Sequence, residues 1–342
     1  MTAPKISVAM SVYNGERFLA EAIQSVLIQT FGDFEFLILD DGSTDSSRAI
    51  ISSAAARDSR VRAISRENRG LIASLNQLLD EARAPYIARM DADDICKPKR
   101  FERQVAFLES HPDYGVIGTW TDDIDEDGAP YRITAADLPT THEAFVQAIE
   151  NEAPLICHPA VMMRREVVLA AGGYHAAFRH CEDLDLWLRL ASMTKLASIP
   201  EHLLLYRHYA GQVSSRHAVE QQIGAAIARV AYRERVAGRP DPTAQITTLP
   251  PIDTLDTLFA RAGVAREVRA MVAQALLYSP VAIRGEGFDL LLRHLAEGGS
   301  REGMWRTVAR LIRLGEPLRA ARLTYALLRM TPGQSSEQAE AA

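Results

Sequence analysis

The chain lacks the features that mark secreted and membrane-spanning proteins. Its 342 residues include three cysteines, at positions 96, 157 and 181, which are too few and too irregularly spaced for a disulfide framework. The N-terminus shows no secretory signal, and no stretch approaches the roughly 18 uninterrupted apolar residues that a membrane span requires. These absences predict a soluble, cytoplasmic protein that touches a membrane at most from its surface.

An excess of positive charge is also missing. The formal net charge is -6 and the isoelectric point is near 5.9, which argues against a surface built for nucleic acid. Of the residues, 47% are hydrophobic and 24% are charged. The chain is long enough for one large and one smaller domain. We therefore expect a globular protein with a substantial core and no nucleic-acid partner.

Short apolar segments alternate with helical ones in the first hundred residues. Residues 5–12 (KISVAMSV) and 33–41 (DFEFLILDD) are typical of buried strands, whereas residues 17–30 and 71–82 repeat apolar side chains at the helical period. Two further strand-like segments follow the same alternation. The pattern predicts an α/β fold in which a mostly parallel sheet carries helices on both faces.

Polar side chains stand where the expected strands end. In parallel sheets, ligands bind beyond the carboxyl ends of the strands, because side chains and helix N-termini meet there. One crevice should therefore contain Ser11, Tyr13, Asn14, Asp40, Asp41, Asn68, Asp91 and Asp93. For the two neighbouring acids at positions 40 and 41, the alternative is turn and cap chemistry before a glycine.

The fourth strand ends in a D-x-D pattern, Asp91 and Asp93. Carboxylates alone would repel a diphosphate, but Mg²⁺ or Mn²⁺ can bridge the two, because these ions prefer oxygen ligands. The alternative is that the acids from Asp91 to Asp94 only cap the following turn. Their position at a strand end favours metal binding for the first two, whereas Asp94 is expected to cap the turn or face solvent.

Beyond residue 100 the pattern becomes mixed and then helical. From residue 216 the composition shifts to Ala, Leu and Arg at helical spacing, interrupted by a proline-rich stretch at 238–251. We expect a ligand-binding domain over 1–215, a helical region over 216–330 and a disordered tail over 331–342.

Several motifs, in order, resemble those of the family 2 glycosyltransferases. They are ISVAMSVYNG at 6–15, FLILDDGSTDSS at 36–47, YIARMDADD at 86–94, HPAVMM at 158–163 and HCEDLDLWLRL at 180–190. The resemblance covers about residues 4–217. It implies the GT-A fold, a Rossmann-like nucleotide-diphospho-sugar transferase domain with a nucleotide-binding half over 1–100 and an acceptor-binding half over 101–215.

The resemblance also implies an activity. Members of this family transfer a hexose from a nucleotide diphosphate sugar, with inversion, and here a UDP-sugar is favoured over dTDP- or GDP-sugars. The implied acceptor is a hydroxyl of a saccharide or a lipid-linked glycan, in the synthesis of cell-surface polysaccharide or lipopolysaccharide-type glycans. The implied cofactor is Mn²⁺ or Mg²⁺.

In the first half, the resemblance assigns roles to matching residues. It implies that Ser11 and Tyr13 hold the base, and that Asp41 accepts a hydrogen bond from uracil N3–H, which suits a carboxylate because it is only an acceptor. Asp93 is implied as the direct metal ligand, with Asp91 nearer the ribose or beside the metal. The rest of the nucleotide-binding set is Asn14 and Asn68.

In the second half, the pair Glu182 and Asp183 matches the family's catalytic acids. A single displacement with inversion needs a base for the incoming hydroxyl, and the resemblance implies Asp183. Capping of the following helix is compatible with this role, and Asp185 is the local competitor. His208 matches a position near the diphosphate or metal, although a packing role is equally consistent with its loop.

One subgroup of the family does not match. Its processive members carry a Q-x-x-R-W motif and transmembrane helices, and neither occurs in this sequence, so the resemblance indicates an enzyme that adds one or a few sugars. Two other classes stay open: a degenerate GT-A domain that binds a nucleotide or a partner without turnover, and a phosphohydrolase. The latter needs an aspartate nucleophile after the first strand, where this chain has Ser-Val-Tyr-Asn.

Two further patterns have functional and structural interpretations. Residues 305–330 interleave six arginines with apolar residues, which suits contact with the inner face of an anionic membrane but also a packed helical pair with a solvated face. Histidines at 158, 180, 202, 208 and 217 fall in one region with Cys157 and Cys181. Their adjacent pairs lack C-x-x-C or H-x(3–5)-H spacing, which disfavours a zinc site.

Overall fold

The computed structural model describes residues 3–131, 137–209, 217–277 and 279–329. The chain divides into two compact units. Met1–Ala176 together with Glu182–Ala210 form the sheet unit, and Ala177–Cys181 together with Gly211–Ala342 form the helical unit. The expected tail, 331–342, lies outside the described residues.

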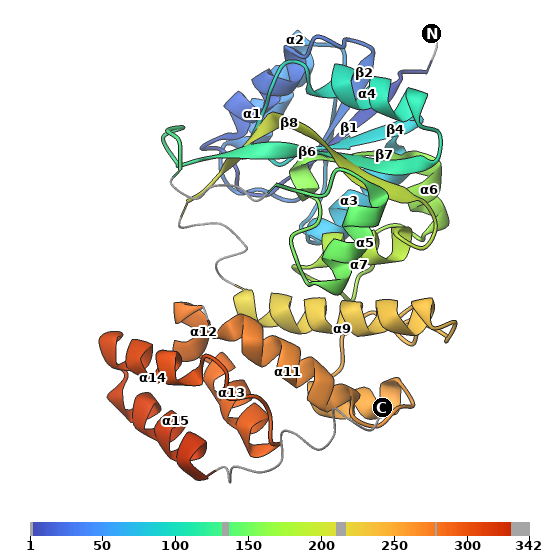
Figure 1. Ribbon diagram of the computed structural model, residues 1–342. Helices are drawn as coiled ribbons and strands as arrows, with labels where there is room; N and C mark the ends of the chain where they lie inside the picture. Colours follow the sequence, from blue (N-terminus) through green and yellow to red (C-terminus); the bar gives the residue numbers. More distant parts are fainter. Residues whose placement is uncertain (1–2, 132–136, 210–216, 278, 330–342) are drawn as a thin grey trace. The chain divides into compact units, whose positions relative to one another are not determined.

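The strands of the sheet unit form one curled sheet (Figure 1). Within the described residues its order is β3-β2-β1-β4-β7-β6-β8-β5. The pairs β1–β2, β2–β3, β1–β4 and β6–β8 are parallel, whereas β7 is antiparallel to β4 and β6, and β5 is antiparallel to β8. The strands are β1 (Ile6–Val12), β2 (Phe34–Asp40), β3 (Val61–Ser65), β4 (Tyr86–Arg89), β5 (Ile95–Cys96), β6 (Tyr114–Ile124), β7 (Met162–Arg164) and β8 (Lys195–Arg207).

Helices cover both faces of this sheet, as the alternating sequence predicts (Figure 1). One face carries α1 (Leu19–Leu27), α2 (Ser47–Arg57) and α4 (Arg100–Ser110), and the other carries α3 (Leu71–Glu81), α5 (His142–Glu150) and α7 (Glu182–Leu190). The short helices η1 (His158–Ala160) and α6 (Arg165–Ala170) flank β7. The predicted α/β fold is confirmed.

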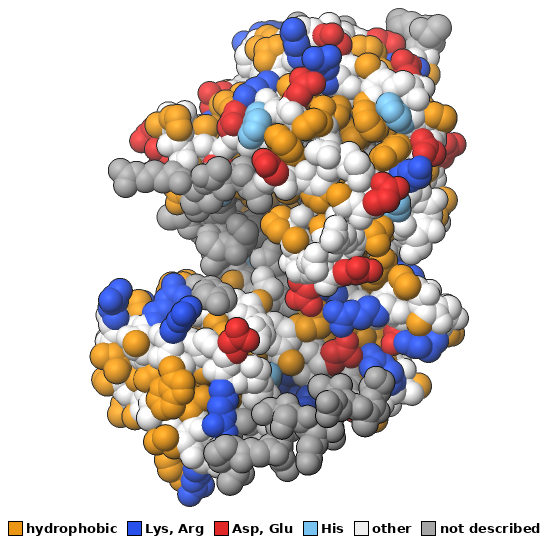
Figure 2. Space-filling view, viewed as in Figure 1, with side chains coloured by type: hydrophobic (Ala, Val, Ile, Leu, Met, Phe, Trp, Pro, Cys, Tyr) orange, Lys and Arg blue, Asp and Glu red, His pale blue; other side chains and the backbone are white. Residues whose placement is uncertain are grey.

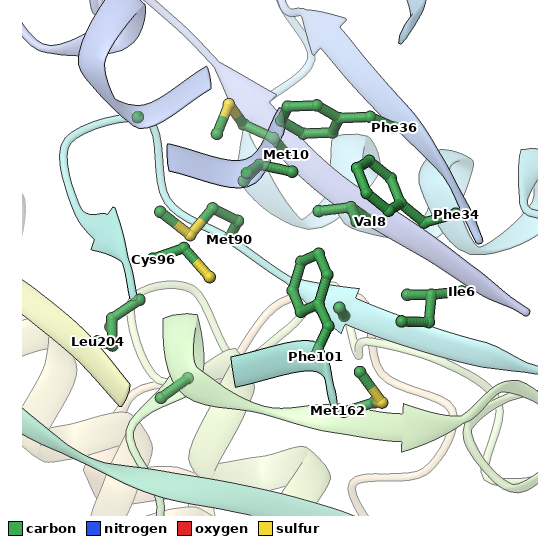
Figure 3. Packing of buried hydrophobic residues seen from close by; sticks show 14 of the residues in the cluster. Ile6, Val8, Met10, Phe34, Phe36, Met90, Cys96, Phe101, Met162 and Leu204 are labelled. Carbon is green, nitrogen blue, oxygen red and sulfur yellow. The ribbon is translucent and has the colours of Figure 1, made fainter. Parts of the chain in front are cut away.

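Alternate residues of the central strands build the core under α1, α2 and α4 (Figure 3). Ile6 and Val8 of β1 lie beside Phe34 and Phe36 of β2 on this face, because side chains two apart on a strand point the same way. Phe101 of α4 packs edge-on against Phe34, with ring centroids 5.8 Å apart. Every residue of β2 is buried, which is expected of an inner strand covered on both sides.

The helical unit has a core of its own. Leu291, Leu311 and Leu323 come from three different helices and belong to one buried cluster. None of the described helices is long and apolar enough to cross a membrane. The helices are α9 (Ala218–Val236), η2 (Ile252–Thr254), α10 (Leu255–Leu258), α11 (Val264–Leu276), α12 (Pro280–Arg284), α13 (Gly287–Ala296), α14 (Met304–Arg313) and α15 (Pro317–Arg329).

Candidate functional site

The loops that follow β1, β2 and β3 meet at one edge of the sheet. Asn14 has a left-handed φ of 52°; its side-chain oxygen accepts the N–H of Thr44 at 2.8 Å, and its own N–H donates to the Ser43 hydroxyl at 3.0 Å. Gly42 has φ of 79°, and a Cβ there would lie 2.7 Å from the backbone nitrogen of Asn68. A glycine at this position therefore lets the second and third loops approach each other.

The ends of β1 and β2 differ in exposure. Ser11 is partly buried, whereas Tyr13 is 56% exposed, which leaves its ring accessible to a ligand. Asp40 is buried, and although burial by itself would raise its pKa, hydrogen bonds from Ser43, Ser65 and an arginine of α2 outweigh that effect and lower it. Asp40 is thus an ionised anchor for the loop after β2.

Asp41 is buried beneath the loop that follows β3. Its Oδ1 accepts hydrogen bonds from Arg66 Nε at 2.9 Å and from the N–H of Arg69 at 3.1 Å, and its Oδ2 accepts the N–H of Gly70 at 2.8 Å. A carboxylate offers about four acceptor directions, two on each oxygen. Oδ2 therefore keeps one direction for a donor such as a base N–H.

Three carboxylates follow β4. One oxygen from each of Asp91, Asp93 and Asp94 lies within 4.8 Å of the others. Burial raises the pKa of Asp93 to about 6, and the charge of Asp91 acts in the same direction. Asp94 is 1% exposed and accepts the Arg207 N–H at 2.9 Å, so the expectation that it faces solvent is wrong. The backbone of β8 provides the partner that keeps Asp94 inside.

This set of donors fits a hard divalent cation. Burial and the charges of neighbouring carboxylates raise the pKa of Asp93 and of Asp94, and Asp94 Oδ2 is buried without a hydrogen-bond partner among the described residues. A cation would relieve both the repulsion and the missing bond. An all-oxygen donor set is the kind that Mg²⁺ and Mn²⁺ prefer.

The end of β8 closes over these acids. The buried Arg207 donates from Nε to the backbone oxygen of Asp93 at 2.9 Å, and its NH2 group pairs with Glu21 of α1 at 2.7 Å. The Tyr209 hydroxyl donates to Asp93 Oδ2 at 3.0 Å. Sequence reasoning missed both Arg207 and Tyr209, although both stand beside the histidine that it singled out.

His208 points to different partners. Its Nε2 lies 3.1 Å from Asp123 Oδ1, and its ring stacks on Tyr131 with centroids 4.6 Å apart. Adjacent residues of an extended segment point to opposite sides. Tyr209 therefore contacts the expected metal ligand, and the contact of His208 with a diphosphate stays a prediction.

Glu182 and Asp183 form the first turn of α7. Glu182 is 6% exposed, and burial together with the charge of Asp183 raises its pKa to about 7. Burial also raises the pKa of Asp183, although its Oδ1 accepts the N–H of Leu184 at 2.7 Å. The charge of Asp91 raises both pKa values further, so the two acid groups, 91 residues apart in sequence, lie within electrostatic reach of each other.

A buried cation connects the two groups of acids. Arg89, at the end of β4, is 4% exposed and forms an ion pair with Asp91. Its charge also opposes the effect of burial on the pKa of Asp93, Glu182 and Asp183. Sequence reasoning missed this residue; the available signal was an arginine inside an apolar strand directly before the acids.

Asp185, the competitor for the catalytic role, has a structural partner. It is 1% exposed, and its Oδ2 accepts a hydrogen bond from Arg189 Nε at 2.9 Å. The same guanidinium donates to the backbone oxygens of Ala171 and Gly173 at 2.6 and 2.8 Å. Asp185 therefore orients an arginine that holds the turn after α6.

A sheet of this order, with carboxylates for a metal after β4 and a buried acid pair at the start of α7, is the arrangement of a GT-A glycosyltransferase. The chain belongs to glycosyltransferase family 2: the model described as "Glycosyl transferase family 2" matches residues 7–170. EpsE of Bacillus subtilis, which carries the name "Putative glycosyltransferase EpsE", is 42% identical over 192 residues, which are 55% of this chain and 67% of EpsE. The amylovoran biosynthesis glycosyltransferase AmsE of Erwinia amylovora is 32% identical over 214 residues, 61% of this chain and 79% of AmsE.

Solved structures share the fold. TarS of S. aureus, residues 1–349, in complex with UDP-GlcNAc, is similar with a TM-score of 0.56 and 16% identity, over 91% of this chain and 92% of that one. The mannosyltransferase PcManGT of Pyrobaculum calidifontis, in complex with GDP-Man and Mn²⁺, gives a TM-score of 0.53 and 16% identity, over 96% and 87% of the two chains. The chain is therefore a glycosyltransferase with the GT-A fold.

Proposed function

We propose that this enzyme is an inverting, non-processive hexosyltransferase that uses a nucleotide diphosphate sugar, with a UDP-sugar favoured, and Mn²⁺ or Mg²⁺. The observation that carries the proposal is that the charges of Arg89 and Asp91 change the pKa of Glu182 and Asp183. The carboxylates after β4 that could hold a metal therefore lie near an acid pair whose pKa values are raised. The nucleotide sugars and the Mn²⁺ bound to TarS and PcManGT support the donor class and the metal. The name of AmsE supports a role in cell-surface polysaccharide synthesis.

In the proposed reaction, Asp183 takes the proton of the acceptor hydroxyl. The acceptor oxygen then bonds to the anomeric carbon of the sugar as the bond from that carbon to the diphosphate oxygen breaks, and the nucleoside diphosphate leaves. A carboxylate with a raised pKa is a better base near neutral pH, and the charge of Arg89 opposes this rise in the pKa of Asp183. A bound divalent ion supplies charge stabilisation for the leaving diphosphate.

The donor would lie along the edge where the strand loops meet. Tyr13 supplies an exposed ring for the base, and Asp41 Oδ2 supplies an acceptor direction. Asp91 and Asp93 then stand next to the diphosphate. Ser11, Asn14 and Asn68 complete this edge in the proposal.

Binding of nucleotides tests the donor class. UDP, dTDP, GDP and ADP are titrated calorimetrically into the protein with Mn²⁺ or Mg²⁺, and again with EDTA. We expect UDP to bind most tightly, and the binding to be lost with EDTA and in Asp93→Asn, because the acids then cannot hold the cation. Asp113→Asn, which changes an exposed carboxylate paired with Lys195, is the matched control and should bind like the unchanged protein. Metal-independent binding would favour a degenerate GT-A domain that binds a nucleotide without turnover, and no binding of any nucleotide would favour one that binds a partner instead.

We also propose that the acceptor is lipid-linked and that α14 and α15 rest on an anionic membrane. Leu318, Tyr325 and Leu328 of α15 are 81%, 56% and 71% exposed, and their spacing of seven and three residues places them on one side of the helix. Figure 2 shows hydrophobic side chains beside arginines on this part of the helical unit. Arg322 and Arg329 fall on the same side of α15, and apolar residues flanked by arginines are typical of helices that lie at a membrane surface.

A further inference from the structure

We propose that His180, His217 and Glu220 form a second metal site, in the helical unit, for a divalent transition ion of the Zn²⁺ type. One ligand atom from each residue lies within 4.8 Å of the other two. Glu220 Oε2 is 3.6 Å from His180 Nε2 and 3.6 Å from His217 Nδ1. This site goes beyond the proposed transfer reaction, and its existence does not depend on that proposal.

The fold brings these residues together through a close approach of two segments. A Cβ at Gly224 of α9 would lie 2.4 Å from Cys181 Sγ, so only a glycine lets α9 pack this tightly on segment 177–181. His217, Glu220 and Gly224 are spaced by three and four residues and share one side of α9 and its first turn. The same side therefore presents the histidine and the glutamate next to His180.

The side chains are close to the geometry that a tetrahedral ion needs. Bonds of about 2.0–2.1 Å to nitrogen and oxygen require ligand atoms roughly 3.3 Å apart, and the two measured separations of 3.6 Å are only slightly longer. The imidazole rings stack 4.0 Å apart at an angle of 9°, so they must tilt for both lone pairs to reach one ion. His217 is 45% exposed and its ring has room to turn.

The chemistry of the donors selects the ion. Burial lowers the pKa of His180, which keeps its imidazole neutral and its lone pair available. Two imidazoles and one carboxylate suit Zn²⁺ and its neighbours, whereas the all-oxygen acids after β4 suit Mg²⁺ and Mn²⁺. His180 also has a backbone φ of 66°, a conformation that costs free energy in a residue with a side chain and that recurs at ligand-holding positions. Three protein ligands leave a fourth position for water.

The spacing of the sequence hides this site. His180 and His217 are 37 residues apart in the sequence. Among the three residues, only His217 and Glu220 have the i, i+3 spacing that places two side chains on the same side of a helix. Bound metal would connect segment 177–181 to the start of α9. Ions that bind only the folded chain stabilise it, so the site should be visible as a rise in thermal stability.

The test uses the full chain without an added histidine tag, in the Asp93→Asn background so that the acids after β4 contribute little. We expect one equivalent of Co²⁺ to bind with the visible absorption of a four-coordinate nitrogen–oxygen site, and Zn²⁺ to displace it and raise the unfolding temperature. Excess Mg²⁺ should not displace it. Because both affected side chains are about half exposed, His217→Ala and Glu220→Gln should fold, and each should weaken Co²⁺ binding more than tenfold.

The matched control is His202→Ala, which removes a partly exposed histidine whose Nδ1 lies 2.9 Å from Asp122 in the sheet unit. It should leave the Co²⁺ spectrum and the Zn²⁺-dependent stability unchanged. The proposal is overturned by absence of Co²⁺ binding in the Asp93→Asn background, or by binding that His217→Ala and Glu220→Gln do not weaken. Both readouts are independent of sugar transfer, so they separate this site from the proposed function.

Discussion

At the scale of single residues, the site is a balance of buried charge. Burial raises the pKa of Asp93, Glu182 and Asp183, and the charge of Asp91 raises each of these pKa values further. Arg89 is the buried cation that opposes this rise. With these opposing effects, Glu182 and Asp183 have raised pKa values that suit proton acceptance, and the acids after β4 can still ionise when a cation binds.

Removal of Arg89 should therefore destabilise the fold. We expect Arg89→Met to lower the free energy of unfolding by about 3 kcal/mol, because it leaves Asp91 and its neighbours without a buried counter-charge. Urea denaturation at pH 7 measures the loss. Arg17→Met removes the exposed pair between Arg17 and Glu126 and should cost less than about 1 kcal/mol. Equal losses in the two variants would show that Arg89 does not compensate the acids.

Substitutions at Asp183 and Asp185 of α7 should have different effects, one on catalysis and the other on stability. Asp183→Asn removes the proposed base without changing shape, so transfer should fall by about 10²–10⁴-fold while nucleotide binding and stability are retained. Asp185→Asn breaks the buried pair with Arg189 and should lower the unfolding temperature instead. Rates with a matched nucleotide sugar and thermal scans of both variants give the answer. Full transfer activity in Asp183→Asn would contradict the assignment of the base.

At the scale of elements, one buried glutamate joins the parallel strands. Glu35 of β2 accepts the Ser7 hydroxyl of β1 at 2.6 Å, Arg62 of β3 at 2.8 Å and the N–H of Arg83, just before β4, at 2.8 Å. Burial by itself would raise the pKa of Glu35, but these hydrogen bonds lower it from 4.5 to about 2. Four consecutive parts of the sheet thus depend on one ionised side chain.

This network predicts a pH-dependent stability. Because the folded pKa lies below the unfolded value, Glu35 stabilises the fold fully above about pH 4.5, and the contribution is lost as the pH falls toward 2. At pH 7 it amounts to about 3 kcal/mol, from 2.5 pKa units at about 1.4 kcal/mol each. The free energy of unfolding of Glu35→Gln should be lower than that of the unchanged protein by about 3 kcal/mol at pH 7. The two values should approach each other as the pH falls toward 2. Denaturation at pH 7, 4 and 3 tests it, because the loss falls between about pH 4.5 and 2.

The control for this variant is Glu109→Gln. Glu109 pairs with Lys5, and both side chains are at least 37% exposed, so the change should cost less than about 1 kcal/mol at any pH. A difference between Glu35→Gln and the unchanged protein that stays constant from pH 7 to pH 3 would show that the carboxylate charge is not the source of the stability.

The sequence predicts where strands and helices occur better than it predicts which of them lie side by side. Apolar runs such as 33–41 predict β2 correctly, because burial on both faces leaves a continuous signal. The three-residue β7 pairs with both β4 and β6, and no local pattern states that placement. The same limit applies at the site: the motifs predict the acids, whereas the contact of Tyr209 with Asp93 and the orientation of His208 arise from packing between distant segments.

At the scale of the whole chain, family membership rests on the sheet unit, and the helical unit carries the features that the family motifs do not explain. The match over residues 7–170 ends before the helical unit begins. That unit holds both the proposed site at His180 and the exposed apolar side of α15.

The proposed membrane contact is tested with vesicles of phosphatidylglycerol and of phosphatidylcholine. The protein should float with the anionic vesicles at low salt, release them as salt screens the arginines, and ignore the neutral vesicles. Each leucine that enters the interface contributes up to about 1.5–3 kcal/mol, so Leu318→Glu combined with Leu328→Glu should weaken binding more than tenfold. Met193→Glu, at a 51% exposed position of the sheet unit, is the control. Binding that the double variant retains, or that neutral vesicles support equally, would assign α15 a packing role instead.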